Sequence, residues 1–342
     1  MDLLKLIQNF AQDCIAKRPV IVLGSGASAG HGIPGMWPLG QELKNSALPS
    51  DITPIELEGW NTFCNRIQEI DLETALTEIS ITEKLTKHIV TTTWEFLNAA
   101  DLKLFQKITS DRQYLPLTQL FRHLFQSTTT DIQVVTPNYD RLAEYAAEAG
   151  GYMAYTGFTY GMLGLRAGVT PPKVHTGRNP NRTVNIWKVH GSFGWFHDAN
   201  DVVISLPPTS TIPIGMFPVI VTPGVEKYRL THDEPFRTTM LNADSAIRSA
   251  TSFLSIGYGF NDSHMQPFLT QRCNTDRLPL LLITKEISSK AHEFFKTGKC
   301  QCFLAMEECP SGTKIFCNEY PDGIELNGPP YWQLGEFLNL IR

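Results

Sequence analysis

The sequence has no long hydrophobic run and no run of basic residues. None of its segments approaches the ~18 consecutive apolar residues that a membrane-spanning helix needs. Lys and Arg number 29 against 34 Asp and Glu, so the net charge is −5. A broad nucleic-acid-binding face needs clustered basic charge, which this balance argues against. We therefore expect neither membrane insertion nor direct nucleic-acid binding.

The sequence also lacks the cysteine spacing of common zinc sites. None of the seven cysteines forms a Cys-x-x-Cys pair, and residues 65–272 contain no cysteine. Cys300, Cys302, Cys309 and Cys317 gather late in the chain, but their spacing is not that of a zinc ribbon. We therefore expect no metal. An odd number of unevenly spread cysteines suits a reducing compartment, which predicts a cytoplasmic protein.

The composition is that of a globular α/β protein. The chain has 342 residues, of which 42% are hydrophobic and 18% charged. This length fits one large α/β domain or two modest ones, and we expect residues 1–342 to form a single domain. Apolar residues recur at three- and four-residue steps over residues 3–15, which predicts an amphipathic helix rather than a targeting signal.

Short apolar runs alternate with helical patterns along much of the chain. The runs predict buried strands at residues 19–23, 132–136, 184–189, 218–222, 252–256 and 278–284. Helical patterns lie between them at about residues 140–150, 233–249, 263–272 and 286–297. This alternation predicts an α/β fold with a Rossmann-like, mostly parallel sheet and helices on both faces.

Three segments depart from this alternation. Residues 39–128 show helical stretches and no strand pattern, so we expect a helical insertion within the domain. Residues 151–183 are rich in Gly, Thr, Pro and Tyr, which predicts a small irregular excursion with hairpin character. Residues 329–342 contain an apolar stretch that predicts a C-terminal helix.

Polar or Gly-rich segments follow four of the predicted strands. They are Gly24–Ser28, Thr136–Asp140, Lys188–Ser192 and Ser255–Gly259. In open α/β sheets, ligands bind beyond the carboxyl ends of the strands. We therefore expect these four segments to converge on one site although they are far apart in sequence.

The first segment matches a loose dinucleotide fingerprint, Gly24-x-Gly26-x-x-Ala29. Glycines of this pattern let backbone N–H groups approach a pyrophosphate, but a tight turn without a ligand has the same composition. Pro34 and Pro38 oppose an immediate long helix. No acidic residue ends a second strand about 20 residues on, as an ordinary dehydrogenase requires.

The second and third segments carry candidate catalytic side chains. Asn138 and Asp140 can cap the following helix, or Asn138 can bind a ribose hydroxyl or a water while Asp140 orders the loop. His190 follows a strand and precedes Gly191. Its side chain is either a general base, since its ordinary pKa is ~6.5, or a hydrogen-bonded structural histidine.

The fourth segment combines close backbone approach with a helix start. Gly257 follows an apolar strand, and its lack of a side chain allows a neighbouring backbone or a ligand to come close. Asn261, Asp262 or Ser263 can then cap the next helix.

In this order, the four segments resemble the motifs of the sirtuin family. Gly24–Ser28 followed by Gly32-Ile33-Pro34 is similar to the family's Gly-Ala-Gly-x-Ser…Gly-Ile-Pro loop, and Thr136-x-Asn138-x-Asp140 to its Thr-Gln-Asn-Ile-Asp motif. Lys188–Gly191 is similar to the strand that carries the family's catalytic histidine, and residues 257–262 to its later nucleotide loop. The resemblance is to the divergent, bacterial NAD-consuming branch of antiphage-defence type.

Two departures separate the chain from the family's deacylases. Those enzymes carry a zinc ribbon of two Cys-x-x-Cys pairs, which this chain lacks. They also continue with Asp-Phe-Arg after the Pro that corresponds to Pro34, where this chain has Gly35-Met36-Trp37. Both departures weaken the case for an acyl-lysine peptide as substrate.

The resemblance implies that NAD, as the substrate, lies across the strand ends. It implies His190 as general base, Asn138 as the residue that holds water or a ribose hydroxyl, and Asp140 as their support. It implies NAD contacts at Gly24, Ser25, Gly26, Ala27, Ser28, Pro34, Thr136, Asn138, Gly257 and Tyr258. The expected activity is an NAD glycohydrolase that releases nicotinamide and ADP-ribose.

Two other functions share these residues. An NAD-dependent protein deacylase needs an acylated peptide as well, whereas a sensor or scaffold binds NAD or ADP-ribose without turnover. The resemblance further implies an effector of antiviral defence that depletes NAD. Such an effector works as a homo-oligomer or with a partner such as a HerA-type ATPase or a short Argonaute. Residues 39–128 and 331–338 are candidate contact surfaces, although the C-terminal stretch can instead dock on the protein's own core.

Overall fold

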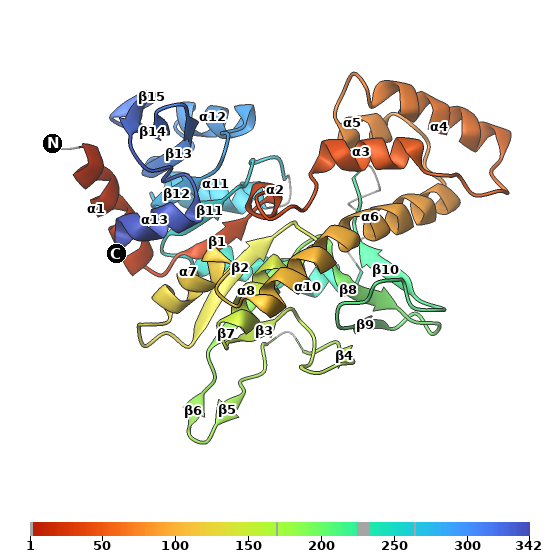
Figure 1. Cartoon of the computed structure of the whole chain (residues 1–342), viewed down its shortest axis with the longest axis horizontal. Helices are drawn as coiled ribbons and strands as arrows, with labels where there is room; N and C mark the ends of the chain where they lie inside the picture. The colour runs from red at the N-terminus through yellow and green to blue at the C-terminus, as the bar shows by residue number, and fades with distance from the viewer. Residues whose placement is uncertain (1–2, 169, 224–232, 263–264) are drawn as a thin grey trace.

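The computed structural model describes residues 3–168, 170–223, 233–262 and 265–342. Its centre is a nine-stranded sheet with the order β15-β14-β13-β12-β11-β1-β2-β7-β3 (Figure 1). The strands are β1 (Val20–Leu23), β2 (Asp131–Thr136), β3 (Met153–Tyr155), β7 (Thr183–Lys188), β11 (Phe253–Ile256), β12 (Leu280–Ile283), β13 (Phe303–Cys309), β14 (Gly312–Cys317) and β15 (Tyr320–Asn327).

The sheet is mostly parallel. Six neighbouring pairs, from β3 to β13, run parallel, and only β14 and β15 join antiparallel at one edge. From β1 the chain builds outward through β2 and β7 in one direction, and through β11, β12 and β13 in the other. The strand order therefore reverses between β1 and β11, where open α/β sheets bind their ligands.

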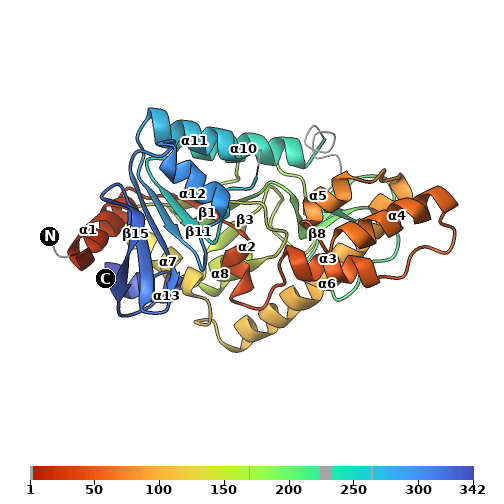
Figure 2. The same cartoon turned by 90° about the horizontal axis from the view of Figure 1, so that it is seen from above.

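Helices cover both faces of the sheet (Figure 2). The side chains of β1 are all apolar and point alternately to the two faces, so both faces must be covered. Ile21 and Leu23 pack in one core, and Val20 and Val22 in another. The first core includes α1 (Leu3–Ala16), α7 (Pro116–Leu124), α8 (Leu142–Ala149) and α13 (Leu334–Ile341). The second includes α10 (Phe236–Ser249), α11 (Gln266–Thr275) and α12 (Ser289–Lys296).

A second lobe joins the helical insertion to a small antiparallel sheet. After the short α2 (Ser25–Ala29), the helices are α3 (Met36–Asn45), α4 (Pro54–Arg66), α5 (Leu72–Thr77) and α6 (Glu83–Ser110). The small sheet has the order β10-β8-β9-β4, with β4 (Gly164–Leu165), β8 (Gly191–His197), β9 (Val203–Ser205) and β10 (Phe217–Ile220). Helix residues share a third core with Phe193, Phe196 and Ile220 of this sheet.

The predicted α/β class, mostly parallel sheet and helices on both faces are confirmed. The buried strand predicted at 218–222 is present as β10, but its expected place in the mostly parallel sheet is wrong: it pairs antiparallel with β8 in the small sheet, because an apolar run does not specify its neighbours. Within residues 151–183, a hairpin of β5 (His175–Thr176) and β6 (Asn179–Pro180) is present, but β3 joins the main sheet and is not irregular.

Two helix boundaries also differ from the prediction. The C-terminal helix covers Leu334–Ile341 rather than all of 329–342. Helix α3 begins at Met36, so Pro38 lies in its first turn, where a missing N–H costs no hydrogen bond. Among the helices of the described residues, none is long and apolar enough to cross a membrane.

Candidate functional site

The segments after β1 and β11 are in direct backbone contact at the point where the strand order reverses. The Gly24 N–H donates to Ile256 O at 3.0 Å, and the Gly26 N–H donates to Gly257 O at 3.0 Å. A Cβ on Gly24 would lie 2.3 Å from Gly257 O, and one on Gly257 would lie 2.2 Å from Ala27 N. Glycine is therefore required here for contact between the two loops themselves.

This contact changes the interpretation of the dinucleotide fingerprint. The Gly24 and Gly26 N–H groups are used within the protein, and the Ala27 N–H donates to Gly24 O at 3.0 Å. Ser25 and Gly26 are nevertheless exposed at the strand end, where polar groups can meet a ligand. Pro34 lies half-buried after α2, on a loop held by the Ile33 N–H to Ser28 O hydrogen bond of 3.4 Å.

Asn138 joins the end of β2 to the loop after β1. The buried Thr136 hydroxyl donates to Leu23 O at 2.9 Å and accepts from the Asn138 N–H at 3.1 Å. Asn138 Nδ2 donates to Gly24 O at 2.9 Å and to Ser28 Oγ at 3.3 Å. Because these bonds use the amide nitrogen, Oδ1 is the atom with which Asn138 can accept a hydrogen bond from a ligand.

Asp140 is buried beneath this loop and supports it. Its Oδ1 accepts at 3.1 Å from the N–H of Leu142, the first residue of α8. Burial raises the pKa of Asp140, while nearby Lys188 acts in the opposite direction. Asp140 thus bonds the first backbone N–H of α8, whereas the N-cap residue itself is Arg141 and makes no side-chain cap bond.

Lys188 is fully buried at the end of β7 and is bonded to the loop that carries Asn138 and Asp140. Its Nζ donates to the backbone oxygen of Asp140 and lies 3.1 Å from Glu144 Oε1. Burial also raises the pKa of Glu144. The sequence could have indicated this contact, because Lys188 lies in a predicted buried strand and a buried ammonium needs partners.

A buried ion pair fixes the next residue of the loop to the helical insertion. Arg141 pairs with Asp101 of α6 at 2.7 Å, and both side chains are almost entirely buried. Asp101 also accepts from the Arg141 N–H at 2.8 Å and from the Tyr145 hydroxyl at 2.6 Å. Asn98 accepts from the same guanidinium. The insertion therefore positions the segment that carries Asn138.

His190 lies beyond β7 and is paired across the site with Asp262. The register of β2 and β7 aligns Thr136 with Lys188, so Asn138 and His190 stand at equivalent positions after neighbouring strands. His190 Nε2 lies 3.1 Å from Asp262 Oδ2, and the two side chains are 10% and 6% exposed. From the sequence, Asp262 was considered as a helix cap and as the end of the later nucleotide loop, because nothing local in the chain indicates a contact with His190.

Two tyrosines border this pair. Tyr258 is buried next to Asp262, and burial together with that carboxylate raises its pKa. Burial also raises the pKa of Tyr139, whose hydroxyl donates to Val221 O at 2.6 Å. Both phenols therefore stay protonated and can act as hydrogen-bond donors at neutral pH.

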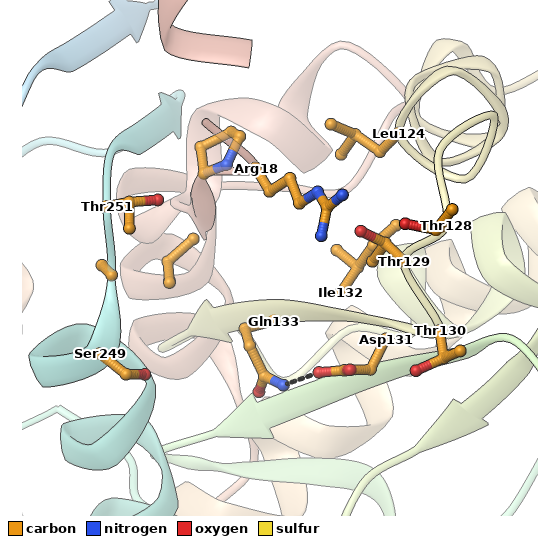
Figure 3. A pocket seen from close by; sticks show the side chains of 13 residues that line it. Arg18, Leu124, Thr128, Thr129, Thr130, Asp131, Ile132, Gln133, Ser249 and Thr251 are labelled. Carbon is orange, nitrogen blue, oxygen red and sulfur yellow. Dashed lines mark hydrogen bonds between the residues drawn. The ribbon is translucent and has the colours of Figure 1, made fainter. Parts of the chain in front are cut away.

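A cavity of about 350 Å³ lies elsewhere, at the amino ends of β1, β2 and β11 (Figure 3). Arg18 extends into it, and Gln133 donates to Asp131 on its floor at 2.7 Å. None of the predicted site residues lines this cavity. Among the described residues, no group of three or more His, Cys, Asp or Glu side chains is arranged to hold a metal.

Fold and site thus define an α/β protein with a polar site where the strand order of a Rossmann-like sheet reverses. A family model described as a SIR2-like domain matches residues 132–300, which include Asn138, His190 and Asp262. Residues 132–300 therefore match a SIR2-like domain. The Gly24–Ser28 segment lies outside the matched residues.

Solved structures similar to the chain include several Sir2 proteins. One, from work on the mechanism and regulation of Sir2 enzymes, is 14% identical over 84% of this chain and 88% of that chain, with a TM-score of 0.43. A variant Sir2 homologue in complex with 2'-O-acetyl ADP ribose is 13% identical over 100% and 96%, with a TM-score of 0.43. A Sir2 homologue–NAD complex is 14% identical over 82% and 83%, with a TM-score of 0.38. No curated protein matches the chain.

Proposed function

We propose that the protein cleaves NAD into nicotinamide and ADP-ribose. The SIR2-like domain supports an NAD-related enzymatic function. The observation that carries the proposal is the alignment of Asn138 and His190 beyond neighbouring strands, next to the loop after β1. One residue can bind water or a ribose hydroxyl, and the other can accept a proton.

The residues present fit NAD as substrate. Exposed Ser25 and half-buried Asn138 offer polar atoms at the reversal of strand order, where nucleotides bind in such sheets. The buried carboxylate of Asp140 and the ammonium of Lys188 hold the Asn138 loop in place, so its carboxamide is preorganised. Preorganised polar groups are what a reaction through a charged transition state requires.

The proposed reaction is a displacement at the ribose carbon that bears nicotinamide. The carbon–nitrogen bond breaks, its electron pair goes to the pyridinium nitrogen, and neutral nicotinamide leaves. A water oxygen forms the new bond to this carbon, and His190 accepts the proton that the water loses. Asn138 Oδ1 accepts a hydrogen bond from the water or from a ribose hydroxyl.

An NAD-dependent deacylase is the second candidate, because it uses the same NAD site. It also needs an acyl-lysine peptide, whereas Gly35-Met36-Trp37 stands where the deacylases carry Asp-Phe-Arg. A sensor that binds NAD or ADP-ribose without turnover is the third candidate. It has no need of a water-binding amide and a base side by side, so Asn138 and His190 favour an enzyme.

The proposed biological role is depletion of NAD in antiviral defence. An enzyme that destroys a central cofactor must be silent until it is triggered. We therefore propose regulation by homo-oligomerisation or by a partner such as a HerA-type ATPase or a short Argonaute. The ion pair of Asp101 and Arg141 joins the insertion to the Asn138 loop. A partner that binds α3–α6 and shifts α6 would therefore also shift this loop.

The test is NAD cleavage without any acyl peptide. Purified protein is incubated with NAD, and nicotinamide and ADP-ribose are separated by chromatography. We expect N138A and H190A each to lower the rate by about 10²- to 10⁴-fold, the range for positioned acid–base groups. H197A is the matched control, because His197 pairs with exposed Asp201.

Three outcomes separate the candidates. Cleavage by the wild type and by H197A, but not by the two site variants, supports the glycohydrolase. Cleavage that requires added acyl-lysine peptide supports the deacylase instead. Undiminished cleavage by an N138A/H190A double variant would refute the proposed roles.

A further inference from the structure

The cavity at the amino ends of β1, β2 and β11 lies at the opposite edge of the sheet from the candidate site (Figure 3). Three connections meet there: the turn from α1 to β1 at Arg18, the loop from α7 to β2 at 128–130, and the turn from α10 to β11 at 249–251. Its volume of about 350 Å³ is near the lower end for ligand pockets, which run from about 300 to 1,000 Å³. The space therefore fits a small molecule rather than a whole dinucleotide.

Arg18 reaches this cavity from an unusual backbone position. It has a φ of +58°, and its N–H donates to Ile15 O at 2.9 Å just beyond the end of α1. Helices that end on a left-handed residue usually have glycine there, because a Cβ disfavours that conformation. The chain instead has an arginine whose side chain extends into the cavity (Figure 3). A disfavoured conformation that aims a charged group into a cavity points to a ligand.

Hydroxyl groups lie on the same side of the cavity as the Arg18 guanidinium. They belong to Thr128 and Thr129 (Figure 3). The Thr129 Oγ1 atom is buried and has no hydrogen-bond partner among the described residues, and Arg18 forms no ion pair with any of them. A buried hydroxyl and a guanidinium with unused N–H groups both gain hydrogen bonds from the oxygens of an oxyanion. Phosphate is an oxyanion of this kind.

The floor of the cavity suits alcohol groups instead. Gln133 Nε2 donates to Asp131 Oδ2 at 2.7 Å, and Gln133 Oε1 accepts from the Trp187 indole N–H at 2.9 Å. These bonds orient the Asp131 carboxylate, which keeps lone pairs that can accept from hydroxyl groups. Its negative charge also opposes a second anionic group on the ligand.

We propose that this cavity binds a small sugar that carries one phosphate. The phosphate binds the Arg18 guanidinium and the hydroxyls of Thr128 and Thr129. The sugar hydroxyls donate to Asp131. The site is separate from the candidate NAD site, and no residue of that site lines it.

The experiment is isothermal titration calorimetry of the full chain with ribose 5-phosphate, and separately with ribose and with inorganic phosphate. R18G removes the guanidinium and supplies the residue that this backbone conformation favours, so the fold is preserved. R277G is the matched control, because Arg277 also has a positive φ, +54°, and does not line the cavity. T129V removes only the unpartnered hydroxyl and keeps the shape of the side chain.

The effect of each variant follows from the bond that it removes. We expect R18G to weaken ribose 5-phosphate binding by at least about tenfold and T129V by about three- to tenfold, because charge-assisted hydrogen bonds are stronger than neutral ones. We expect R277G to bind like the wild type. Inorganic phosphate should bind at least about tenfold more weakly than ribose 5-phosphate, because it makes no contact with Asp131. Ribose alone should give no measurable heat.

Three results would overturn the proposal. They are an unchanged affinity in R18G, inorganic phosphate that binds as tightly as ribose 5-phosphate, and no heat with any probe at millimolar concentration. Binding here requires no NAD cleavage. A protein that cleaves NAD can therefore fail this test, and one that never cleaves NAD can pass it.

Discussion

The contact between the loops after β1 and β11 leaves no room for a Cβ atom at Gly257. Gly257 has a φ of +60°, a conformation that L side chains adopt at a cost. Its hydrogens also face the backbone of Gly26 and Ala27, so any Cβ would collide with main-chain atoms rather than with a flexible side chain. Conformation and close approach therefore both require glycine at this one position.

Gly257→Ala tests this requirement at residue scale. Gly215→Ala is the matched control, because Gly215 has a φ of +75° and nothing within 4 Å of its virtual Cβ. We expect G215A to lower the free energy of unfolding by about 1–2 kcal/mol, the cost of the left-handed conformation. We expect G257A to lower the free energy of unfolding by about 1–3 kcal/mol more than G215A does, because its Cβ overpacks against main-chain atoms.

Urea unfolding followed by fluorescence measures both variants. If G257A and G215A lose the same stability, then the loops separate without cost and the contact is not required. The same experiment with bound NAD shows whether the contact also shapes the proposed site.

The candidate site shows which of its residues a sequence can suggest and which contacts it cannot. Asn138, Asp140 and His190 were predicted as site residues because each follows an apolar strand, and parallel strands bring their carboxyl ends to one edge. The contact of Asp262 with His190 was not found, because it depends on the path of a loop across the sheet. A side chain that bonds the backbone three residues ahead gives no local sign of a second, distant partner.

At the scale of elements, Glu56 joins two helices of the insertion. It is the N3 residue of a capping box at the start of α4: it accepts from the Thr53 N–H at 2.9 Å, while Thr53 Oγ1 accepts from the Glu56 N–H at 3.3 Å. Its other oxygen accepts at 2.5 Å from Thr82, the cap of α6. The hydrogen bonds from Thr82 and Thr53 lower the pKa of Glu56 to about 2.

This lowered pKa predicts a pH-dependent contribution to stability. Because the folded-state pKa lies below the ordinary value of 4.5, the contribution is complete above about pH 4.5. It is lost as the pH falls toward about 2, where the folded carboxylate is protonated. We therefore expect E56Q to be less stable than the wild type at neutral pH, with a difference that shrinks on acidification.

Urea midpoints measured from about pH 7 down to about pH 3 test this prediction. E58Q is the control, because Glu58 is an exposed carboxylate of the same helix. We expect E58Q to follow the wild type closely. A difference between E56Q and wild type that stays constant over this range would contradict the assigned role of the carboxylate.

Elements were predictable where local pattern alone defines them. The runs at 19–23, 132–136, 252–256 and 278–284 became β1, β2, β11 and β12, because strands buried on both faces are continuously apolar. The strands β13, β14 and β15 were not predicted: β13 turns polar at its end, and β14 and β15 join antiparallel at a half-exposed sheet edge. Which sheet β10 joins depends on its partner β8, and no local pattern encodes that choice.

At the scale of the whole molecule, α6 connects two hydrophobic cores. Its first half, with Leu85, Ile89 and Trp94, packs in the core of the second lobe, and the Trp94 indole N–H donates to Phe193 O at 2.9 Å. Its last turns, with Leu104 and Ile108, pack in the core of the main sheet. A continuous helix through both cores predicts that the lobes unfold together.

Ala99→Pro tests this coupling, because Ala99 is exposed on α6 between the two sets of core residues. Proline removes a helix hydrogen bond and clashes with the preceding turn, at a cost of about 3 kcal/mol or more. Ala99→Gly, the control, keeps the helix and costs about 1 kcal/mol. By calorimetry we expect one transition for the wild type, one at lower temperature for A99G, and two for A99P. A single transition in A99P, or two in the wild type, would show that α6 does not set the cooperativity of the lobes, and a partner on the insertion would then need another route to Asn138.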